Sequence, residues 1–279
     1  MVNGKFRVID SHCHIYPDKI AAKATEGTDR FYGEHSVNSG TVSDLLQRGK
    51  AAGVEHFVVQ SVATSPKQVT SINEFIAKDV NENSGLLTGL GTLHPESQDI
   101  EADVARIISL GLHGVKLHPD IQQFPADCPG YMKIYELCER EGLPILLHTG
   151  DYRYDFSNPN RVIRVLKAFP GLTVVGAHLG GWSVWDKAME ILPGTPNLYV
   201  DCSSCFPFTD KEHVYRMIRK YGCDRVLFGT DYPMWSVSDE LETFMSLEFT
   251  DDERRAMLSE NAEKVFNINS DISSKFEIC

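Results

Sequence analysis

The stretch FRVIDSHCH, residues 6–14, joins a short apolar run to two histidines spaced two residues apart. The apolar run predicts a buried strand over Phe6–Asp10. Other runs of this kind follow, most of them rich in Val, Ile and Leu on both faces, as strands covered on two sides should be. These further predicted strands are His56–Ser61, Leu86–Leu93, Gly114–Leu117, Pro144–His148, Leu172–Gly176, Leu198–Asp201 and Val226–Phe228.

Amphipathic segments with recognisable ends lie between these strands. Thr41 to Asp44 resembles a helix start, and Gly53 follows the last apolar residues of that segment as a stop. Other helices are predicted over Ile100–Leu110, Tyr131–Glu141, His213–Tyr221, Asp239–Leu247 and Asp251–Phe266. The connection from Ile15 to Gly40 is polar with little periodicity, which predicts a long loop over the site.

The alternation of strands and helices predicts an α/β fold. Eight βα units in 279 residues favour a single (β/α)₈ TIM-type barrel domain spanning residues 1–279. The alternative is an open doubly wound sheet, which usually carries a glycine-rich phosphate loop after its first strand. This chain has Ser11 to His14 at that place. The closed barrel is therefore preferred.

Composition narrows the class of protein and its partners. Hydrophobic residues make up 42% and charged residues 24%, values typical of a globular protein with a real core. The formal net charge of −12 disfavours nucleic acid and membrane surfaces as partners, so we expect a small-molecule substrate. No signal-like apolar run begins the chain, which predicts a cytoplasmic protein. A homo-oligomer is left open.

The cysteines do not indicate a disulfide framework. Seven is an odd number, and they are scattered over a large chain. Cys202 and Cys205 have the C-x-x-C spacing of redox and zinc motifs, but no second cysteine or histidine pair accompanies them. We expect plain buried or site-lining thiols.

Histidines gather where the predicted strands end. Six of the ten do so (His12, His14, His94, His118, His148 and His178), and Asp231 follows the last strand. In a barrel these ends carry the catalytic groups. The spacing of His12 and His14 turns both imidazoles to one side of an extended chain, where they can bind a transition metal. We predict a metal site formed by His12, His14, His148 and Asp231, although a structural core histidine is the alternative for His148.

Further candidates surround this predicted site. His178 lies among small residues and is the best candidate for an acid/base or oxyanion-stabilising group, or for an extra ligand. Lys116 and His118 share one face of a strand, and a lysine inside a barrel is costly unless it is paired or modified. Lys116 could bridge a second metal as a carbamate, orient a substrate carboxylate, or pair with a neighbouring carboxylate. Candidate pocket-lining residues are Tyr152, Arg153, Trp182, Trp185 and Trp235, and His94 is expected to be structural or at the rim.

Several segments together resemble the amidohydrolase superfamily. They are DSHCH at 10–14, GVKLHP at 114–119, LHT at 147–149, GAHLGG at 176–181, FGTDYP at 228–233 and LSENA at 258–262. The similarity is to the amidohydrolase-related branch, which includes aminocarboxymuconate-semialdehyde decarboxylase, resorcylate-type decarboxylases and pyrone-dicarboxylate lactonase. It spans nearly the whole chain in the right order.

The resemblance implies a barrel with one divalent metal, commonly zinc. By position it makes His12, His14, His148 and Asp231 the ligands, and His178 the catalytic acid/base. Lys116 and His118 have no fixed counterpart in the single-metal members, so a second metal stays open. The resemblance does not select a reaction.

Three functions are weighed. The leading one is hydrolysis of an amide, lactone or ester by a metal-bound water whose pKa falls from about 15.7 to about 7, with Asp231 accepting its proton. The alternative is non-oxidative decarboxylation of a small unsaturated or aromatic acid, with His178 or Asp231 protonating the carbon. The third is a barrel kept as a binding protein, against which the complete set of ligand types argues.

Overall fold

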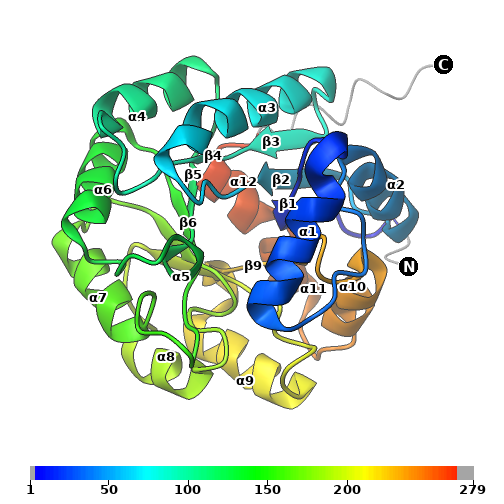
Figure 1. Ribbon diagram of the computed structural model, residues 1–279. Coiled ribbons are helices and arrows are strands. Elements are labelled where there is room, and N and C mark those ends of the chain that lie inside the picture. Colours follow the sequence, from blue (N-terminus) through cyan, green and yellow to red (C-terminus); the bar gives the residue numbers. More distant parts are fainter. Residues whose placement is uncertain (1–3, 269–279) are drawn as a thin grey trace.

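A computed structural model describes residues 4–268 and shows a ring of parallel strands surrounded by helices (Figure 1). Within each of two sheets, β1 to β3 and β4 to β9, every strand pairs in parallel with the next one along the chain. The strands are β1 (Ile9–His14), β2 (His56–Gln60), β3 (Leu87–Gly89), β4 (Gly91–Thr92), β5 (Val115–Leu117), β6 (Ile145–Leu147), β7 (Val174–Gly176), β8 (Leu198–Asp201) and β9 (Val226–Leu227).

The ring is closed at both junctions between its two sheets. At the first, Leu90 joins β3 to β4, and its N–H donates to Val59 O at 2.9 Å. At the second, the Ser11 N–H of β1 donates to Phe228 O, directly after β9, at 3.0 Å. The predicted (β/α)₈ barrel is therefore confirmed, with β3 and β4 together forming its third strand. The single strand predicted over Leu86–Leu93 is interrupted at Leu90, where pairing passes from β2 to β5.

The predicted helices are present with small changes at their ends. At α2 the Thr41 side chain accepts from the Asp44 N–H, and Gly53 has the left-handed φ of 86° that ends a helix without a Cβ clash. A π-helical turn at Ala256–Glu260 interrupts the last predicted helix. The helices are α1 (Asp18–Tyr32), α2 (Val42–Ala52), α3 (Val69–Glu82), α4 (Ile100–Ser109), α5 (Pro119–Gln122), α6 (Pro129–Glu141), α7 (Pro159–Ala168), α8 (Trp185–Ile191), α9 (Lys211–Tyr221), α10 (Val237–Met245), α11 (Asp251–Arg255) and α12 (Asn261–Phe266).

Two predictions near the N-terminus were wrong. The first strand does not stop at Asp10 but continues to His14, with a register shift between Asp10 and Cys13. The segment predicted as a loop over 15–40 contains α1, which follows Pro17 and ends at a left-handed Gly33. Only two of its fifteen residues are buried, so the helix has almost no apolar face for periodicity to reveal.

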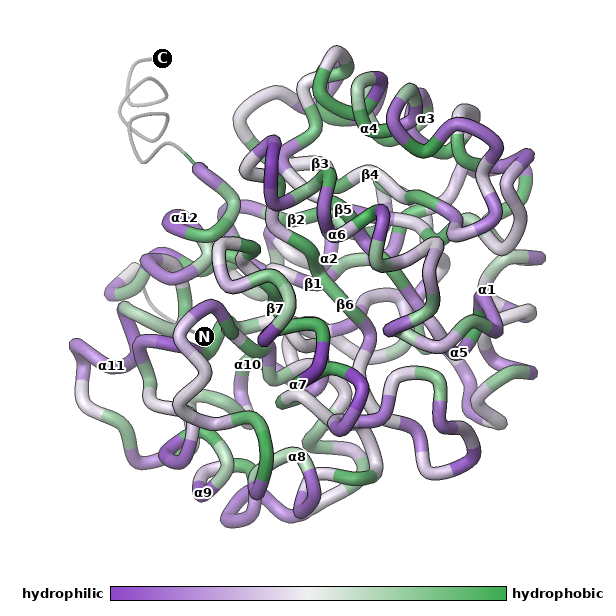
Figure 2. The backbone as a smooth tube through the Cα atoms, turned by 90° about the vertical axis from the view of Figure 1, so that its left-hand side faces the viewer, coloured by the Kyte–Doolittle hydropathy of each residue, from purple (hydrophilic) through white to green (hydrophobic). Residues whose placement is uncertain are grey.

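Apolar packing fills the barrel except at its carboxyl end. One cluster lies inside the barrel and includes Ile9, Val58 and Leu146 of the strands together with Phe266 of α12. A second and larger cluster lies between the strands and the outer helices. Figure 2 shows hydrophobic and hydrophilic residues alternating along outer helices such as α3 and α4. The polar side chains that form the site lie at the carboxyl ends of the strands, beyond this apolar packing.

No helix within residues 4–268 has the length and apolarity needed to span a membrane. The predicted domain bounds of 1–279 include short end segments, 1–3 and 269–279, that lie outside the described residues.

Candidate active site and metal centre

The carboxyl ends of the strands surround one cavity of about 1450 Å³. β1 supplies two histidines, β5 a lysine and the histidine that follows it, and the residues after β6, β7 and β9 supply two histidines and an aspartate. These cavity-lining residues are His12, His14, Lys116, His118, His148, His178 and Asp231. The cavity therefore brings together all the predicted metal ligands and catalytic candidates. His94, which was expected to be structural or at the rim, does not line it.

Three of the four predicted metal ligands point at one place. The Nε2 atoms of His12 and His14 lie 3.2 Å apart. Asp231 Oδ1 lies 3.3 Å from His12 Nε2 and 3.5 Å from His14 Nε2. Ligands bound to one zinc ion at about 2.0–2.1 Å have separations of this size. These three donors therefore fit a divalent metal.

The fourth predicted ligand, His148, lies in the same cavity but outside that group. Its Nδ1 is 3.1 Å from His178 Nε2, and its Nε2 is 3.1 Å from Gly150 O. A second cluster of possible ligands joins it to His118 and Asp120. The imidazoles of His118 and His148 stack face to face, with centroids 3.8 Å apart and planes 9° apart. Stacked rings direct their in-plane lone pairs along parallel lines, so this second cluster suits a shared metal less well.

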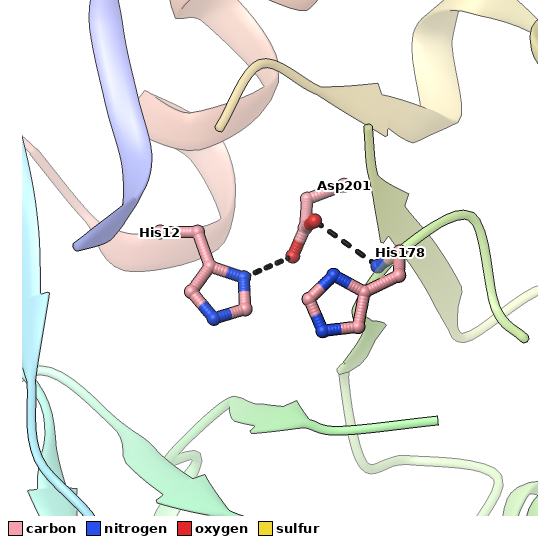
Figure 3. A group of neighbouring side chains, drawn as sticks. All are labelled: His12, His178 and Asp201. Carbon is pink, nitrogen blue, oxygen red and sulfur yellow. Dashed lines mark hydrogen bonds and ion pairs between the residues drawn. The ribbon is translucent and has the colours of Figure 1, made fainter. Parts of the chain in front are cut away.

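Asp201, a residue not singled out from the sequence, contacts His12, one of the candidate metal ligands. His12 Nδ1 lies 2.9 Å from Asp201 Oδ2, and Asp201 Oδ1 accepts from the backbone N–H of His178 at 3.1 Å (Figure 3). A carboxylate beside Nδ1 holds the proton there and leaves the Nε2 lone pair for a metal. The signal was available, because Asp201 ends a predicted strand as His148 does.

Replacing Asp201 with Asn is expected to weaken metal affinity about 10- to 100-fold, because the ligand histidine loses its charged orienting partner. Titration of the metal-free protein against a chromophoric chelator measures this. Asp186→Asn is the matched control, since the Asp186 side chain is 90% exposed on α8. Equal metal affinity for the Asp201 variant and the control would contradict the orienting role.

Burial sets the protonation of the cavity. It lowers the pKa of His178 to about 4 and brings the pKa values of His14, His118 and His148 well below the usual range. Metal ligation requires neutral imidazoles of this kind. Burial would raise the pKa of Asp231, but His12, His178 and His14 lower it to about 2. The site thus offers neutral nitrogens and one carboxylate.

Lys116 is a buried ammonium group beside the metal-binding point. Its Nζ lies 2.9 Å from His12 Nε2, and burial lowers its pKa to about 8. No carboxylate oxygen of residues 4–268 lies within 4.0 Å of this Nζ, so the suggested lysine–carboxylate pair is not observed. Asp231 and Asp201 act on the Lys116 charge from a greater distance and raise its pKa in part. Lys116 therefore has no direct ion pair at the base of the cavity.

Two of the site residues have strained backbone conformations. His178 has a φ of 58° and Asp231 a φ of 59°, in the left-handed region that non-glycine residues seldom adopt. The Trp185 indole N–H donates to His178 O at 2.9 Å, and the Ser204 hydroxyl donates to Asp231 Oδ2 at 2.7 Å. Such strained positions, held by specific contacts, are typical of functional sites.

The predicted pocket-lining residues divide into two groups. Trp182 and Trp235 line a second, smaller cavity that also reaches His148, His178 and Asp231. Tyr152 and Arg153 line neither cavity; Tyr152 is 72% exposed. Trp185 likewise lies outside both cavities and supports the His178 loop instead.

Three other residues noted in the sequence are buried and have structural rather than catalytic surroundings. His94 is buried, and its Nδ1 accepts from the Glu96 N–H at 3.2 Å, as a structural histidine would. Cys202 and Cys205 are buried free thiols, as expected.

Comparison with known proteins places the chain in a family. Residues 9–268 match the sequence profile of the amidohydrolase family. The chain belongs to this family. The resemblance seen in the sequence motifs is thereby confirmed.

One curated relative of this chain is the 2-amino-3-carboxymuconate-6-semialdehyde decarboxylase of Dictyostelium discoideum. The two are 25% identical over 143 residues, which cover 50% of this chain and 38% of the relative. The match thus spans well under half of the relative's length.

Solved structures show the same fold. An uncharacterized TIM-barrel protein from Bordetella bronchiseptica superposes with a TM-score of 0.78 at 22% identity, covering 94% of this chain and 99% of the other chain. A dihydroxybenzoic acid decarboxylase from Polaromonas sp. JS666, with bound manganese and the inhibitor 2-nitroresorcinol, superposes with a TM-score of 0.74 at 16% identity. That match covers 95% of this chain and 98% of the other chain. At these identities the likeness shows the fold alone.

Proposed function

We propose that the protein is a metal-dependent decarboxylase acting without oxidation on a small unsaturated or aromatic acid. The observation that carries the proposal is the unpaired Lys116 ammonium, 2.9 Å from His12 in a buried cavity. A substrate carboxylate would supply the direct ion pair that Lys116 does not form with any carboxylate of residues 4–268. Two of the similar proteins described above are named as decarboxylases of such acids, which supports the same choice.

His12, His14 and Asp231 would hold the metal, and His148 is the adjacent further donor. When bound, the ion supplies a Lewis acid that holds and polarises substrate oxygens. Manganese is bound in the similar decarboxylase from Polaromonas sp. JS666, and zinc is the metal that the sequence resemblance implies. We propose a divalent ion of this kind and name manganese as the first to test.

His178 is the proposed proton donor. His148 Nε2 faces the carbonyl of Gly150 at 3.1 Å, so Nε2 carries the hydrogen and Nδ1 is left as an acceptor. That Nδ1 lies 3.1 Å from His178 Nε2. His178 Nδ1 faces Ser203 O at 3.1 Å and holds the hydrogen of the neutral ring, so the proposed donor is the protonated form of His178, with its second proton on Nε2. When the bond between substrate carbon and carboxylate breaks, its electron pair stays on carbon and carbon dioxide leaves. The proton from His178 Nε2 replaces the carboxylate.

Hydrolysis of an amide, lactone or ester is the second candidate. The observation that favours it is the ionised Asp231 carboxylate, with a pKa of about 2, among the proposed metal ligands. Such a carboxylate can accept the proton of an attacking water. The sequence motifs placed hydrolysis first, but the named relatives favour decarboxylation.

Product analysis separates the two reactions. Manganese-loaded protein is incubated in D₂O with a panel of hydroxybenzoic and unsaturated carboxylic acids, and with lactones and amides of similar size. One carbon dioxide per acid consumed is expected, with solvent deuterium at the carbon that lost it. Chelator-treated protein, tested for retained secondary structure, is the control. Incorporation of ¹⁸O from labelled water into a ring-opened or cleaved product, with no carbon dioxide, would reject the decarboxylase proposal.

A further inference from the structure

Tyr32, the last residue of α1, reaches from that helix into the active site. Figure 1 shows α1 crossing the mouth of the barrel, and Tyr32 lines both the large and the small cavity. Its ring lies edge-on to Trp182, with centroids 5.2 Å apart. Its hydroxyl lies 2.7 Å from Nε2 of His118. The hydroxyl is therefore placed among the site histidines by a segment outside the barrel.

The hydrogen bonds around His118 determine which of these two groups donates. The backbone N–H of Ile121 donates to His118 Nδ1 at 3.2 Å, so Nδ1 presents a lone pair. A neutral imidazole with a free Nδ1 carries its hydrogen on Nε2. His118 Nε2–H therefore donates to the Tyr32 hydroxyl oxygen. This leaves the hydroxyl hydrogen of Tyr32 without an acceptor among residues 4–268.

Two buried tyrosines of this chain use their hydroxyl hydrogens within the protein, whereas the hydroxyl of a third, Tyr135, is enclosed in the core without a partner. Tyr221 donates to Leu179 O at 3.0 Å, and Tyr232 donates to Thr41 O at 3.0 Å. The Tyr32 hydroxyl instead borders the cavity, beside His118, whose ring stacks on that of His148. A hydroxyl hydrogen without a protein acceptor at the cavity wall can donate a hydrogen bond to a bound ligand.

Cation–π contacts hold Tyr32 in place. The Arg153 guanidinium lies 4.8 Å from the Phe31 ring centroid and 5.4 Å from that of Tyr32. Asp151 binds the same guanidinium through both carboxylate oxygens, at 2.9 and 2.7 Å. Arg153 also donates to Phe31 O. Arg153 thus fixes the end of α1 from outside the cavity. The Tyr32 ring is therefore held in position before a ligand binds.

We propose that Tyr32 is a substrate-binding residue that donates a hydrogen bond to an oxygen of the bound acid. The inference rests on the proposed function and adds one requirement for the substrate. The substrate would be an acid with an acceptor oxygen, either of the carboxylate or of a neighbouring hydroxyl, on the α1 side of the cavity. Lys116 and Tyr32 would then contact the polar atoms of one ligand from two elements.

The test is binding of 2,6-dihydroxybenzoate to manganese-loaded full-length protein, measured by calorimetry for the wild type, Tyr32→Phe and Tyr154→Phe. Tyr154 is the matched control, because its ring also lies near Arg153, at 5.2 Å, and stacks on Phe31, yet it lines neither cavity. Tyr32→Phe is expected to weaken binding about 10-fold or more, since a hydrogen bond to a charged group is lost. Metal content and the affinity of the Tyr154 variant should be unchanged.

Hydrogen exchange of residues 18–32 without ligand tests whether Tyr32 only fastens α1. Weaker binding with unchanged exchange supports the proposal. Faster exchange in Tyr32→Phe, or equal affinity of Tyr32→Phe and the wild type, would overturn it. Wild-type protein that binds no acid of the panel would instead contradict the proposed function, and the assignment of Tyr32 with it. The two failures are therefore distinct.

Discussion

Replacing His12 with Ala is expected to remove the metal and the activity together. His12 Nε2 lies within 3.3 Å of His14 Nε2, Lys116 Nζ and Asp231 Oδ1, so it is the atom most central to the site. Without this nitrogen the metal loses one of three convergent ligand atoms, and Lys116 Nζ loses its contact with His12 Nε2. Metal stabilisation of developing charge contributes several kcal/mol, so kcat/KM should fall at least about 10³-fold.

The measurement is metal content by elemental analysis beside steady-state rates on the acid that the product test identifies. His56→Ala is the control for losing a buried histidine. His56 lies on the neighbouring β2 and binds Gly85 O and Thr88, away from the cavity. That variant is expected to lose stability but keep its metal. Stoichiometric metal in folded His12→Ala protein would show that the convergence of His12, His14 and Asp231 is not a metal site.

The barrel could be predicted because its signals are local and repeated. A strand covered on both faces needs a continuous apolar run, as at Ile145–Leu147, and such a run is visible without knowing its neighbours. Gly53, Gly142 and the cap at Thr41 mark helix ends by residue type alone. The helix α1 escaped prediction because only Ala21 and Thr25 of its fifteen residues are buried. The rest of the helix is exposed or, like Tyr32, only partly buried beside the cavity.

The site was predictable only in part, because strand ends identify candidates but not their partners. His12, His14 and Asp231 meet as expected, since three strand ends share one rim. Whether His148 joins them depends on the rotamer and stacking of its ring, which no spacing along the chain encodes. Asp201 was visible as a strand end, but its contact with His12 spans 189 residues. Tyr32 had no signal at all.

Replacing His178 with Ala is expected to leave most of the metal bound but to lower kcat by about 10²- to 10⁴-fold, the contribution of a positioned proton donor. The reason lies in its contacts: His178 Nε2 faces His148 Nδ1 at 3.1 Å, and its Nδ1 faces Ser203 O at 3.1 Å. The close group of His12, His14 and Asp231 does not include it. Loss of the imidazole therefore removes the proposed proton donor but none of these three metal ligands.

His213→Ala is the matched control for this substitution, because His213 lies on α9 and contacts Thr209 and Asp186 outside the cavity. Its rate and metal content should equal those of the wild type. Loss of metal from His178→Ala equal to that from His12→Ala would make His178 a metal ligand and would contradict its assignment as the proton donor.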